Sequence, residues 1–351
     1  MEGKTIRVGI NGAGRIGRAF LRLAHNHSNL EIVAINDLGD IDNIAYLIKY
    51  DTAYGAAQFP VSIKDDPSGS RASNKALIIN GKEVEFLSEK NPTDLPWKYL
   101  NIDVVVEATG AFTTFKKAKG HIDAGAKRVV ITAPAKDEPI DDTQGTVLLG
   151  INDEKLKTCQ ITSNASCTTN AGSPLIQILH EKIGIEKAVL NTVHGYTASQ
   201  SIVDGPNKKD WKEGRAAAMN IVPTSTGAAV AVTKAIPDLE GKFDGISMRV
   251  PVVVGSLADV TFIAKRDTSV EEINKILKEA SSEARWQGVF TITEDPIVSS
   301  DVIGSLFGSI ADLGLTRVIG GNLVKVCAWY DNEMGYSHTL VQHVLRMGQY
   351  I

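Results

Sequence analysis

The sequence of 351 residues has few cysteines and no long apolar run. Its three cysteines, Cys159, Cys167 and Cys327, are odd in number, far apart and without a CxxC pair, which argues against a disulfide framework or a zinc cluster. Cys159 and Cys327 lie in strand-like runs and are expected to be buried. Seven histidines are scattered and none forms HExxH, so no metal site is predicted. No window approaches the ~18 consecutive apolar residues of a membrane-spanning helix.

The chain also has no excess of positive charge. The formal net charge of −4 provides no basic field that would collect the phosphates of a nucleic acid. The first residues include Glu2, Lys4 and Arg7, with no apolar core of signal-peptide length after them. We therefore expect a cytosolic protein that binds neither nucleic acid nor a membrane. With 43% hydrophobic and 22% charged residues, the chain is long enough for two packed domains.

A glycine-rich turn opens the chain. TIRVGI (5–10) has the composition of a strand, and apolar residues recur at helical spacing after NGAGRIG. Gly12, Gly14 and Gly17 thus form GxGxxG between a strand and a helix. In this context the first glycine permits the tight turn, the second lets backbone N–H groups approach a pyrophosphate, and the third lets the helix pack closely.

A carboxylate follows the second predicted strand. EIVAIN (31–36) ends at Asp37, about 20 residues after the last glycine of the motif. A carboxylate at this place hydrogen-bonds a ribose 2′-OH and repels a 2′-phosphate, so NAD is predicted rather than NADP. Taken alone, Asp37 fits a helix cap or a turn residue better, but the glycine motif favours the ribose role.

Strands and a helix alternate further along the first half. Strands are predicted over 103–110, 128–134 and 146–152, and a helix over 115–125. This alternation predicts an α/β, doubly wound Rossmann domain with its ligand at the carboxyl ends of the strands. Candidate ligand residues at those ends are Thr109, Gly110 and Thr132. The polar segment 64–75 is predicted to be a hairpin or loop.

Cys167 lies among small polar residues, in SNASCTTN (163–170). Apolar residues at helical spacing mark a helix that runs from here toward Gly184, so Cys167 is predicted at or beside its start, with Ser166 among the available caps. The helix-end potential and nearby donors stabilise a thiolate. We therefore expect a lowered thiol pKa and a nucleophilic cysteine.

A nucleophilic thiol needs an imidazole within hydrogen-bond reach. His194 is the candidate, because it ends a strand-like run (187–193) that follows the cysteine helix. His180 lies within that helix and is expected to be structural.

Nine motifs then occur in a fixed order: INGAGRIGR, AINDL, EATGAFTT, SNASCTTN, TVHGYT, DGPNKKDW, GRAAAMNIVPTSTGAA, MRVP and AWYDNEMGYS. In this order and spacing the chain resembles the phosphorylating, NAD-dependent glyceraldehyde-3-phosphate dehydrogenases over essentially its whole length. The resemblance implies oxidative phosphorylation of D-glyceraldehyde 3-phosphate to 1,3-bisphosphoglycerate with NAD and inorganic phosphate. Cys167 would attack the aldehyde, His194 would take and return the proton, and phosphate would cleave the resulting thioester.

The resemblance also implies the binding residues. For the cofactor NAD they are Gly12, Gly14, Arg15, Ile16, Asp37, Thr109, Gly110, Thr132, Asn332 and Tyr336. For the substrate phosphate and the attacking phosphate they are Ser166, Thr168, Thr197, Thr226, Gly227 and Arg249. Arg249 is expected to serve both anions, because a guanidinium presents several donors in a fixed fork.

The expected architecture is an NAD-binding Rossmann domain (1–166 with 332–351) and an α+β catalytic domain (167–331) with a mostly antiparallel sheet. The loop 196–218 resembles the family's segment that lines a neighbouring subunit's cofactor pocket. A homotetramer is what the resemblance implies.

Some positions depart from the family pattern, and two rival functions remain open. Ala171 replaces a common second cysteine, and Met334 replaces a common tryptophan. The rivals are an erythrose-4-phosphate dehydrogenase and, from another class, a non-catalytic NAD-binding scaffold. The motifs HGYT and TSTGAA resemble those of the glyceraldehyde-3-phosphate enzyme rather than the erythrose-4-phosphate enzyme. The joint presence of Cys167, His194 and Arg249 argues against a non-catalytic scaffold.

Overall fold

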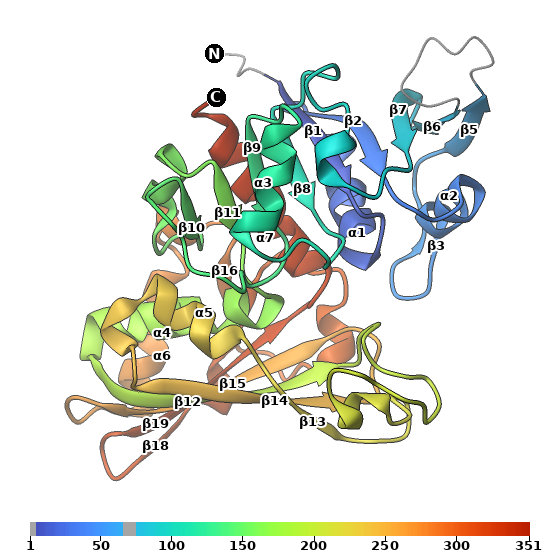
Figure 1. Ribbon diagram of the computed structural model, residues 1–351. Helices are drawn as coiled ribbons and strands as arrows, with labels where there is room; N and C mark the ends of the chain where they lie inside the picture. The colour runs from blue at the N-terminus through green and yellow to red at the C-terminus, as the bar shows by residue number, and fades with distance from the viewer. Residues whose placement is uncertain (1–4, 66–74) are drawn as a thin grey trace. The chain divides into compact units, whose positions relative to one another are not determined.

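The computed structural model describes residues 5–65 and 75–351, and contacts divide the chain into two compact units (Figure 1). The first runs to Val147 and also includes Asp153–Ala165 and Leu340–Ile351, whereas the second comprises Leu148–Asn152 and Ser166–Thr339. These units differ from the predicted domain limits at residues 148–152, 166 and 332–339. Most of the predicted loop 64–75 lies outside the described residues.

The first unit is built on a sheet in which β1 is central and the chain winds outward in both directions. In spatial order its described strands are β10 (Gln144–Thr146), β11 (Ile161–Ser163), β9 (Arg128–Ile131), β8 (Val104–Glu107), β1 (Ile6–Asn11), β2 (Leu30–Asn36), β7 (Lys82–Leu87), β6 (Lys75–Ile79) and β5 (Val61–Asp65). The strands from β10 to β7 pair in parallel, and β7, β6 and β5 pair antiparallel. The order reverses between β1 and β8, which is where such sheets bind ligands.

Helices cover this sheet, with α3 in front of it and α1 behind it in Figure 1. The described α-helices that lie wholly in this unit are α1 (Arg15–Ala24), α2 (Ile41–Lys49) and α3 (Phe115–Asp123). Asp40 caps α2 and Thr114 caps α3 through side-chain oxygens that accept backbone N–H groups. A short hairpin of β3 (Tyr50–Asp51) and β4 (Gly55–Ala56) follows α2.

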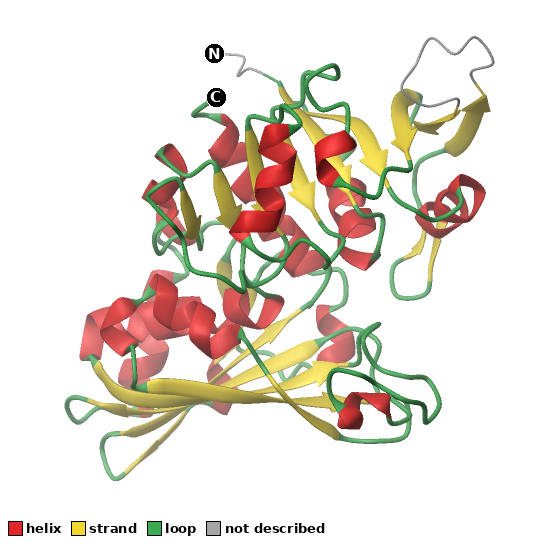
Figure 2. Cartoon of the chain, viewed as in Figure 1, coloured by secondary structure: helices red, strands yellow, loops and turns green. Residues whose placement is uncertain are grey.

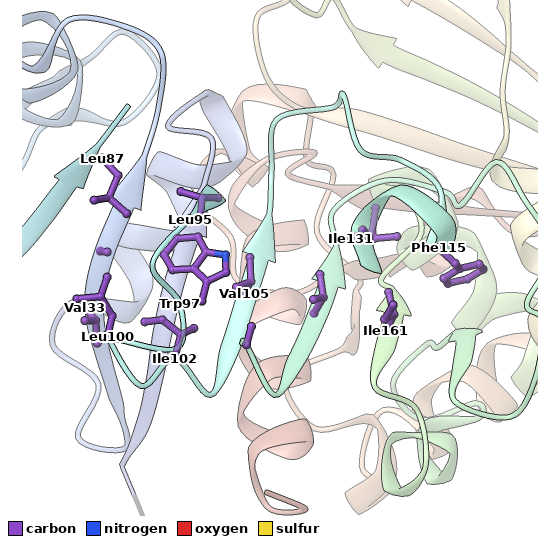
Figure 3. Packing of buried hydrophobic residues seen from close by; sticks show 14 residues of the cluster. Val33, Leu87, Leu95, Trp97, Leu100, Ile102, Val105, Phe115, Ile131 and Ile161 are labelled. Carbon is purple, nitrogen blue, oxygen red and sulfur yellow. The ribbon is translucent and has the colours of Figure 1, made fainter. Parts of the chain in front are cut away.

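One hydrophobic cluster of the first unit lies between the sheet and α3 (Figure 3). Trp97 is fully buried there among Val33, Leu95 and Val105, and its indole N–H donates to His121 Nδ1 at 3.0 Å. The predicted strand over 146–152 holds only at Thr146, where β10 ends, and is wrong for residues 147–152. Its apolar residues are buried, but they form a turn in which Asn152 Oδ1 accepts the Leu148 N–H at 2.8 Å.

The second unit is built on a mixed, mostly antiparallel sheet, as predicted. Its described strands are, in spatial order, β13 (Val222–Ser225), β14 (Phe243–Val250), β12 (Ile185–Gly195), β15 (Ser256–Ala264), β19 (Leu323–Tyr330), β17 (Ser309–Asp312) and β16 (Phe290–Thr293), with β18 (Arg317–Ile319) beside β19. Among the described strands of this second sheet, β12 with β14 and β16 with β17 pair in parallel, and the other pairs are antiparallel.

Helices cover one face of this second sheet, as Figure 2 shows. They are α4 (Cys167–Ile183), α5 (Ala228–Ala235) and α6 (Val270–Ala280), and α7 (Met334–Gly348) follows the last strand. Short 3-10 helices occupy Pro92–Asp94, Asp153–Lys157, Trp211–Gly214, Pro237–Leu239, Ala284–Trp286, Ser299–Val302 and Leu313–Leu315. In residues 5–65 and 75–351, no helix combines the length and the apolar character needed to cross a bilayer.

Candidate active site

The glycine motif forms the turn between β1 and α1. Gly12 has φ +100°, and a Cβ on it would lie 2.8 Å from the backbone of Ala108 and Thr109. A Cβ on Gly17 would lie 2.0 Å from Gly12 O, so the helix can approach the turn only without a side chain there. At Gly14 a Cβ would meet no described atom within 4 Å. The backbone at the start of α1 therefore faces open space, and among the described residues no side chain caps it.

A cavity of about 540 Å³ opens at this turn within the first unit. Gly12, Gly14, Asp37 and Thr109 line it, four of the residues predicted to bind the cofactor. The uncapped N–H groups at the helix start suit a pyrophosphate, and the carboxylate beside them suits a ribose. The cavity therefore fits a dinucleotide.

The other predicted cofactor residues of this unit lie elsewhere on its strand ends and helix. Arg15 forms an ion pair with Asp51 and lies over the Tyr54 ring, 5.7 Å from its centroid. Ile16 is half-buried in the first turn of α1, and Gly110 and Thr132 follow β8 and β9.

Sequence reasoning missed a buried polar network beneath this cavity. Glu107, at the end of β8, accepts hydrogen bonds from the N–H and hydroxyl of Thr109 and lies 3.0 Å from His121 Nε2. Asn11 Nδ2 also donates to Glu107, and Asn36 donates to Asn11 at 2.7 Å. A carboxylate inside the apolar run DVVVEATG was the available signal, because a buried charge needs partners.

In the second unit, Cys167 begins α4, as predicted. Ser166 is the N-cap, and its hydroxyl accepts the Thr169 N–H at 3.1 Å. Cys167 is half-buried, whereas Cys159 and Cys327 are buried. Cys167 Sγ lies 3.3 Å from His194 Nε2, at the end of β12. The structure thus brings the predicted nucleophile and base into contact.

The predicted fall in the thiol pKa is wrong. Burial raises the pKa of Cys167 and outweighs the Arg249 charge and the nearby helix-start donors, which act in the opposite direction. Burial, with the Arg249 charge second, lowers the pKa of His194 to about 3. Both groups are therefore neutral near pH 7, and the imidazole is able to accept the thiol proton.

Tyr330 is a further residue of this site that the sequence did not reveal. Its hydroxyl lies 2.9 Å from Thr168 Oγ1 on α4 and 2.8 Å from Thr192 Oγ1 on β12. Its ring meets that of His194 edge-on, with centroids 5.9 Å apart. Burial raises the pKa of Tyr330, so the phenol stays protonated and joins the elements that carry Cys167 and His194. Its strand-like surroundings gave no sign of this role.

Arg249 is a predicted phosphate ligand that contacts His194 directly. It is the direct neighbour of His194 across β12 and β14, and its Nη1 lies 2.7 Å from His194 Nδ1. Three further predicted phosphate residues make local contacts. Thr197 Oγ1 contacts Ser199, Thr226 Oγ1 accepts the Ala228 N–H, and Gly227 precedes α5.

The two cofactor residues predicted near the end of the chain also lie in the second unit. Asn332 is buried, and its Oδ1 accepts hydrogen bonds from Gly255 N at 3.1 Å and from Ser256 Oγ at 3.0 Å. Tyr336 is buried in the first turns of α7.

Two family models match the chain. One describes the NAD binding domain of glyceraldehyde 3-phosphate dehydrogenase and matches residues 6–115, and the other describes its C-terminal domain and matches 166–332. The chain belongs to the glyceraldehyde-3-phosphate dehydrogenase family. Curated relatives of that name include a second form from Streptomyces avermitilis, 46% identical over 347 residues, and one from Mycobacterium avium, 46% identical over 352 residues. Each match covers 98% of this chain and 99% of the relative.

A fungal relative, glyceraldehyde-3-phosphate dehydrogenase B of Aspergillus oryzae, is 42% identical over 338 residues, which is 96% of either chain. Family membership makes this protein an NAD-dependent dehydrogenase, with NAD as its cofactor. It also favours a glyceraldehyde-3-phosphate dehydrogenase over the alternative of an erythrose-4-phosphate dehydrogenase.

Proposed function

We propose that this protein oxidises D-glyceraldehyde 3-phosphate with NAD and inorganic phosphate to 1,3-bisphosphoglycerate through a thioester on Cys167. The observation that carries the proposal is the 3.3 Å contact between Cys167 Sγ and His194 Nε2 at the start of α4. A glycolytic role follows from the family, whose named relatives cover nearly the whole chain.

The first step is attack on the aldehyde. His194 is neutral and takes the proton of Cys167, whose sulfur forms a bond to the aldehyde carbon. The aldehyde oxygen gains negative charge, and the backbone N–H groups at the start of α4 lie beside the attacking sulfur to stabilise it. The Tyr330 hydroxyl contacts both Thr168 and Thr192, and it thereby holds α4 and β12 in fixed positions during this step.

The cofactor is held at the turn after β1. Gly12 and Gly14 leave room for the pyrophosphate at the start of α1, and Asp37 is the proposed ribose ligand. NAD, when bound, supplies the oxidant that converts the sulfur adduct into a thioester.

Inorganic phosphate then cleaves the thioester. Its oxygen bonds to the acyl carbon, the carbon–sulfur bond breaks, and Cys167 leaves as a thiolate that regains its proton from His194. We assign Arg249, Thr226 and Gly227 to this anion, and Arg249 with Thr197 to the substrate phosphate. Arg249 suits both because its charge lies beside the reacting pair.

The test measures NADH formation from glyceraldehyde 3-phosphate and NAD, with and without inorganic phosphate. Cys167→Ser should abolish turnover, whereas Cys159→Ser, a matched change of a buried thiol, should retain it. Turnover without phosphate would contradict the acyl-transfer half of the proposal. A higher kcat/KM for erythrose 4-phosphate than for glyceraldehyde 3-phosphate would contradict the substrate.

We also propose that copies of this chain associate, as a homotetramer. The support is the uncovered face of the second sheet, where alternation along its strands exposes Val189, Ile246 and Leu323. The loop 196–218 adds Ile202 and Trp211, each more than four-fifths exposed. Sedimentation equilibrium of the protein and of Ile246→Asp tests this, because the added charge should dissociate the assembly and an unchanged mass would contradict the assigned face.

A further inference from the structure

His194 Nδ1 lies between an acceptor and a donor. Gly195 O is 2.6 Å from it, and Arg249 Nη1 is 2.7 Å from it. A ring nitrogen that carries a proton donates to a carbonyl but repels an N–H group, and a bare ring nitrogen does the reverse. The two contacts therefore belong to two different tautomers of the neutral ring.

The two tautomers differ at Nε2, the nitrogen that faces Cys167. When the proton lies on Nδ1 and points to Gly195 O, Nε2 is bare and takes the thiol proton. When Arg249 donates to Nδ1, the ring proton lies on Nε2, and neither ring nitrogen has room for the thiol proton. Only the first tautomer is a base for Cys167.

Arg249 makes few hydrogen bonds in the position that blocks the base. Besides the ring, its Nη1 donates to Gly195 O at 3.1 Å, and its Nε is buried without a hydrogen-bond partner among the described residues. A phosphate offers several charged acceptors to a guanidinium in place of one ring nitrogen and one carbonyl. An anion thus competes effectively for this side chain.

We infer that Arg249 is a positioning residue that sets the tautomer of His194, and that an anion bound to Arg249 releases Nδ1 and makes His194 the base for Cys167. The inference rests on the proposed role of Arg249 as a phosphate ligand. On release, one proton moves from Nε2 to Nδ1 by way of water. The S–H bond of Cys167 then breaks and an Nε2–H bond forms, and nothing is oxidised or reduced.

Among the described residues, the ionisable groups that face His194 are Cys167 from α4, Arg249 from β14 and Tyr330 from β19. Burial and then the Arg249 charge lower the pKa of His194 to about 3, so the free guanidinium also opposes a doubly protonated ring. A bound anion offsets that charge. The ion pair of thiolate and imidazolium should therefore form at lower pH when an anion is present.

The experiment alkylates the NAD-loaded protein with iodoacetamide, a neutral reagent, and follows Cys167 by peptide mass spectrometry. The rate is measured across pH with sulfate as the probe anion and with chloride at equal ionic strength. We expect sulfate to raise the rate near neutral pH by about tenfold, the factor of a charge-assisted hydrogen bond, and to move the profile to lower pH. In Arg249→Met, Cys167 should be alkylated fast without sulfate, and sulfate should not change that rate. In Arg266→Met, a control at an exposed arginine, the rate should respond to sulfate as in the wild type.

An unchanged rate with sulfate in the wild type overturns the inference, and so does an Arg249→Met protein that alkylates more slowly than wild type in chloride. The wild-type comparison decides even where Arg249→Met does not fold. KM values separate the two proposals. Arg249→Met could raise KM for glyceraldehyde 3-phosphate and for inorganic phosphate while its Cys167 is alkylated slowly. That result would support the binding role of Arg249 and contradict the inference about the tautomer. Absence of phosphate-dependent turnover in the wild type would instead defeat the proposed function.

Discussion

Asp37 Oδ2 accepts a hydrogen bond of 2.7 Å from the N–H of Ala13, so the residue after β2 fastens the glycine turn after β1. Its other oxygen accepts the Gly39 N–H at 2.8 Å. The two interpretations considered from the sequence, turn residue and ribose ligand, therefore do not compete. Each carboxylate oxygen has a second lone pair that is able to accept a ribose hydroxyl.

Asp37→Ala should raise KM for NAD by about 10-fold to 100-fold, because it removes charge-assisted hydrogen bonds to the turn and to the ribose. The value of kcat at saturating NAD should change little. Asp40→Ala is the matched control, since Asp40 caps α2 and does not contact the turn residue Ala13. It should cost about 1 kcal/mol of stability and leave KM for NAD unchanged. Equal KM values in both variants would refute the role of Asp37.

His194→Asn should lower kcat by about 10²-fold to 10⁴-fold, the usual contribution of a positioned general base. KM for the aldehyde should change much less. His180→Asn, on α4 with its Nδ1 accepting the Ile185 N–H, removes an imidazole from the same unit and should keep kcat. Initial rates at saturating substrates check this, and a His194→Asn enzyme with nearly normal kcat would show that another group takes the proton.

Tyr330→Phe should lower the free energy of unfolding by about 1–3 kcal/mol, because it leaves the buried hydroxyls of Thr168 and Thr192 without their shared partner. The loss in kcat should be smaller than that of His194→Asn. Thermal unfolding and initial rates measure the two effects, with Tyr99→Phe as an exposed control. A stable Tyr330→Phe protein would mean that the threonines find other partners.

His343 should make the protein less stable as the pH falls below 7. Burial lowers the pKa of His343 to about 3, with the Arg346 charge second, while the unfolded residue titrates near 6.5. Below pH 6.5 the unfolded chain therefore binds a proton that the native one does not, and each such histidine costs about 2 kcal/mol by pH 5.

His343→Gln should reduce the difference in unfolding free energy between pH 7 and pH 5 by that amount. Urea unfolding of both proteins at the two pH values gives the comparison. If the two proteins show the same pH dependence, His343 takes up a proton in the folded protein. That result would contradict a buried, neutral ring held by contacts with Thr162 and Asn164.

Much of this architecture could be predicted, because local signals coincide with it. The glycine motif predicted the strand, turn and helix over residues 5–24, because a tight turn of this kind requires glycine. Ser166 likewise predicted the helix start at Cys167, because serine is a preferred N-cap residue. The error over 147–152 arose because an apolar run is buried equally well in a turn, where Gly150, with φ +78°, and Asn152 reverse the chain. Periodicity does not distinguish the two.

The polar geometry of the site was harder to foresee. Arg249 meets His194 only because β12 and β14 pair in parallel, and the sequence does not state which distant strands pair. The raised pKa of Cys167 likewise depends on how deeply the helix start is buried, which the polar run around it does not reveal.

The central claim is that Cys167 carries the acyl group, and a single turnover tests it most directly. The protein is mixed with NAD and glyceraldehyde 3-phosphate without inorganic phosphate, quenched in acid and examined by peptide mass spectrometry. We predict an acyl adduct on the peptide with Cys167, and its release as an acyl phosphate when phosphate is added before the quench. NADH formation with no adduct on Cys167, or an adduct that phosphate does not discharge, would contradict the account.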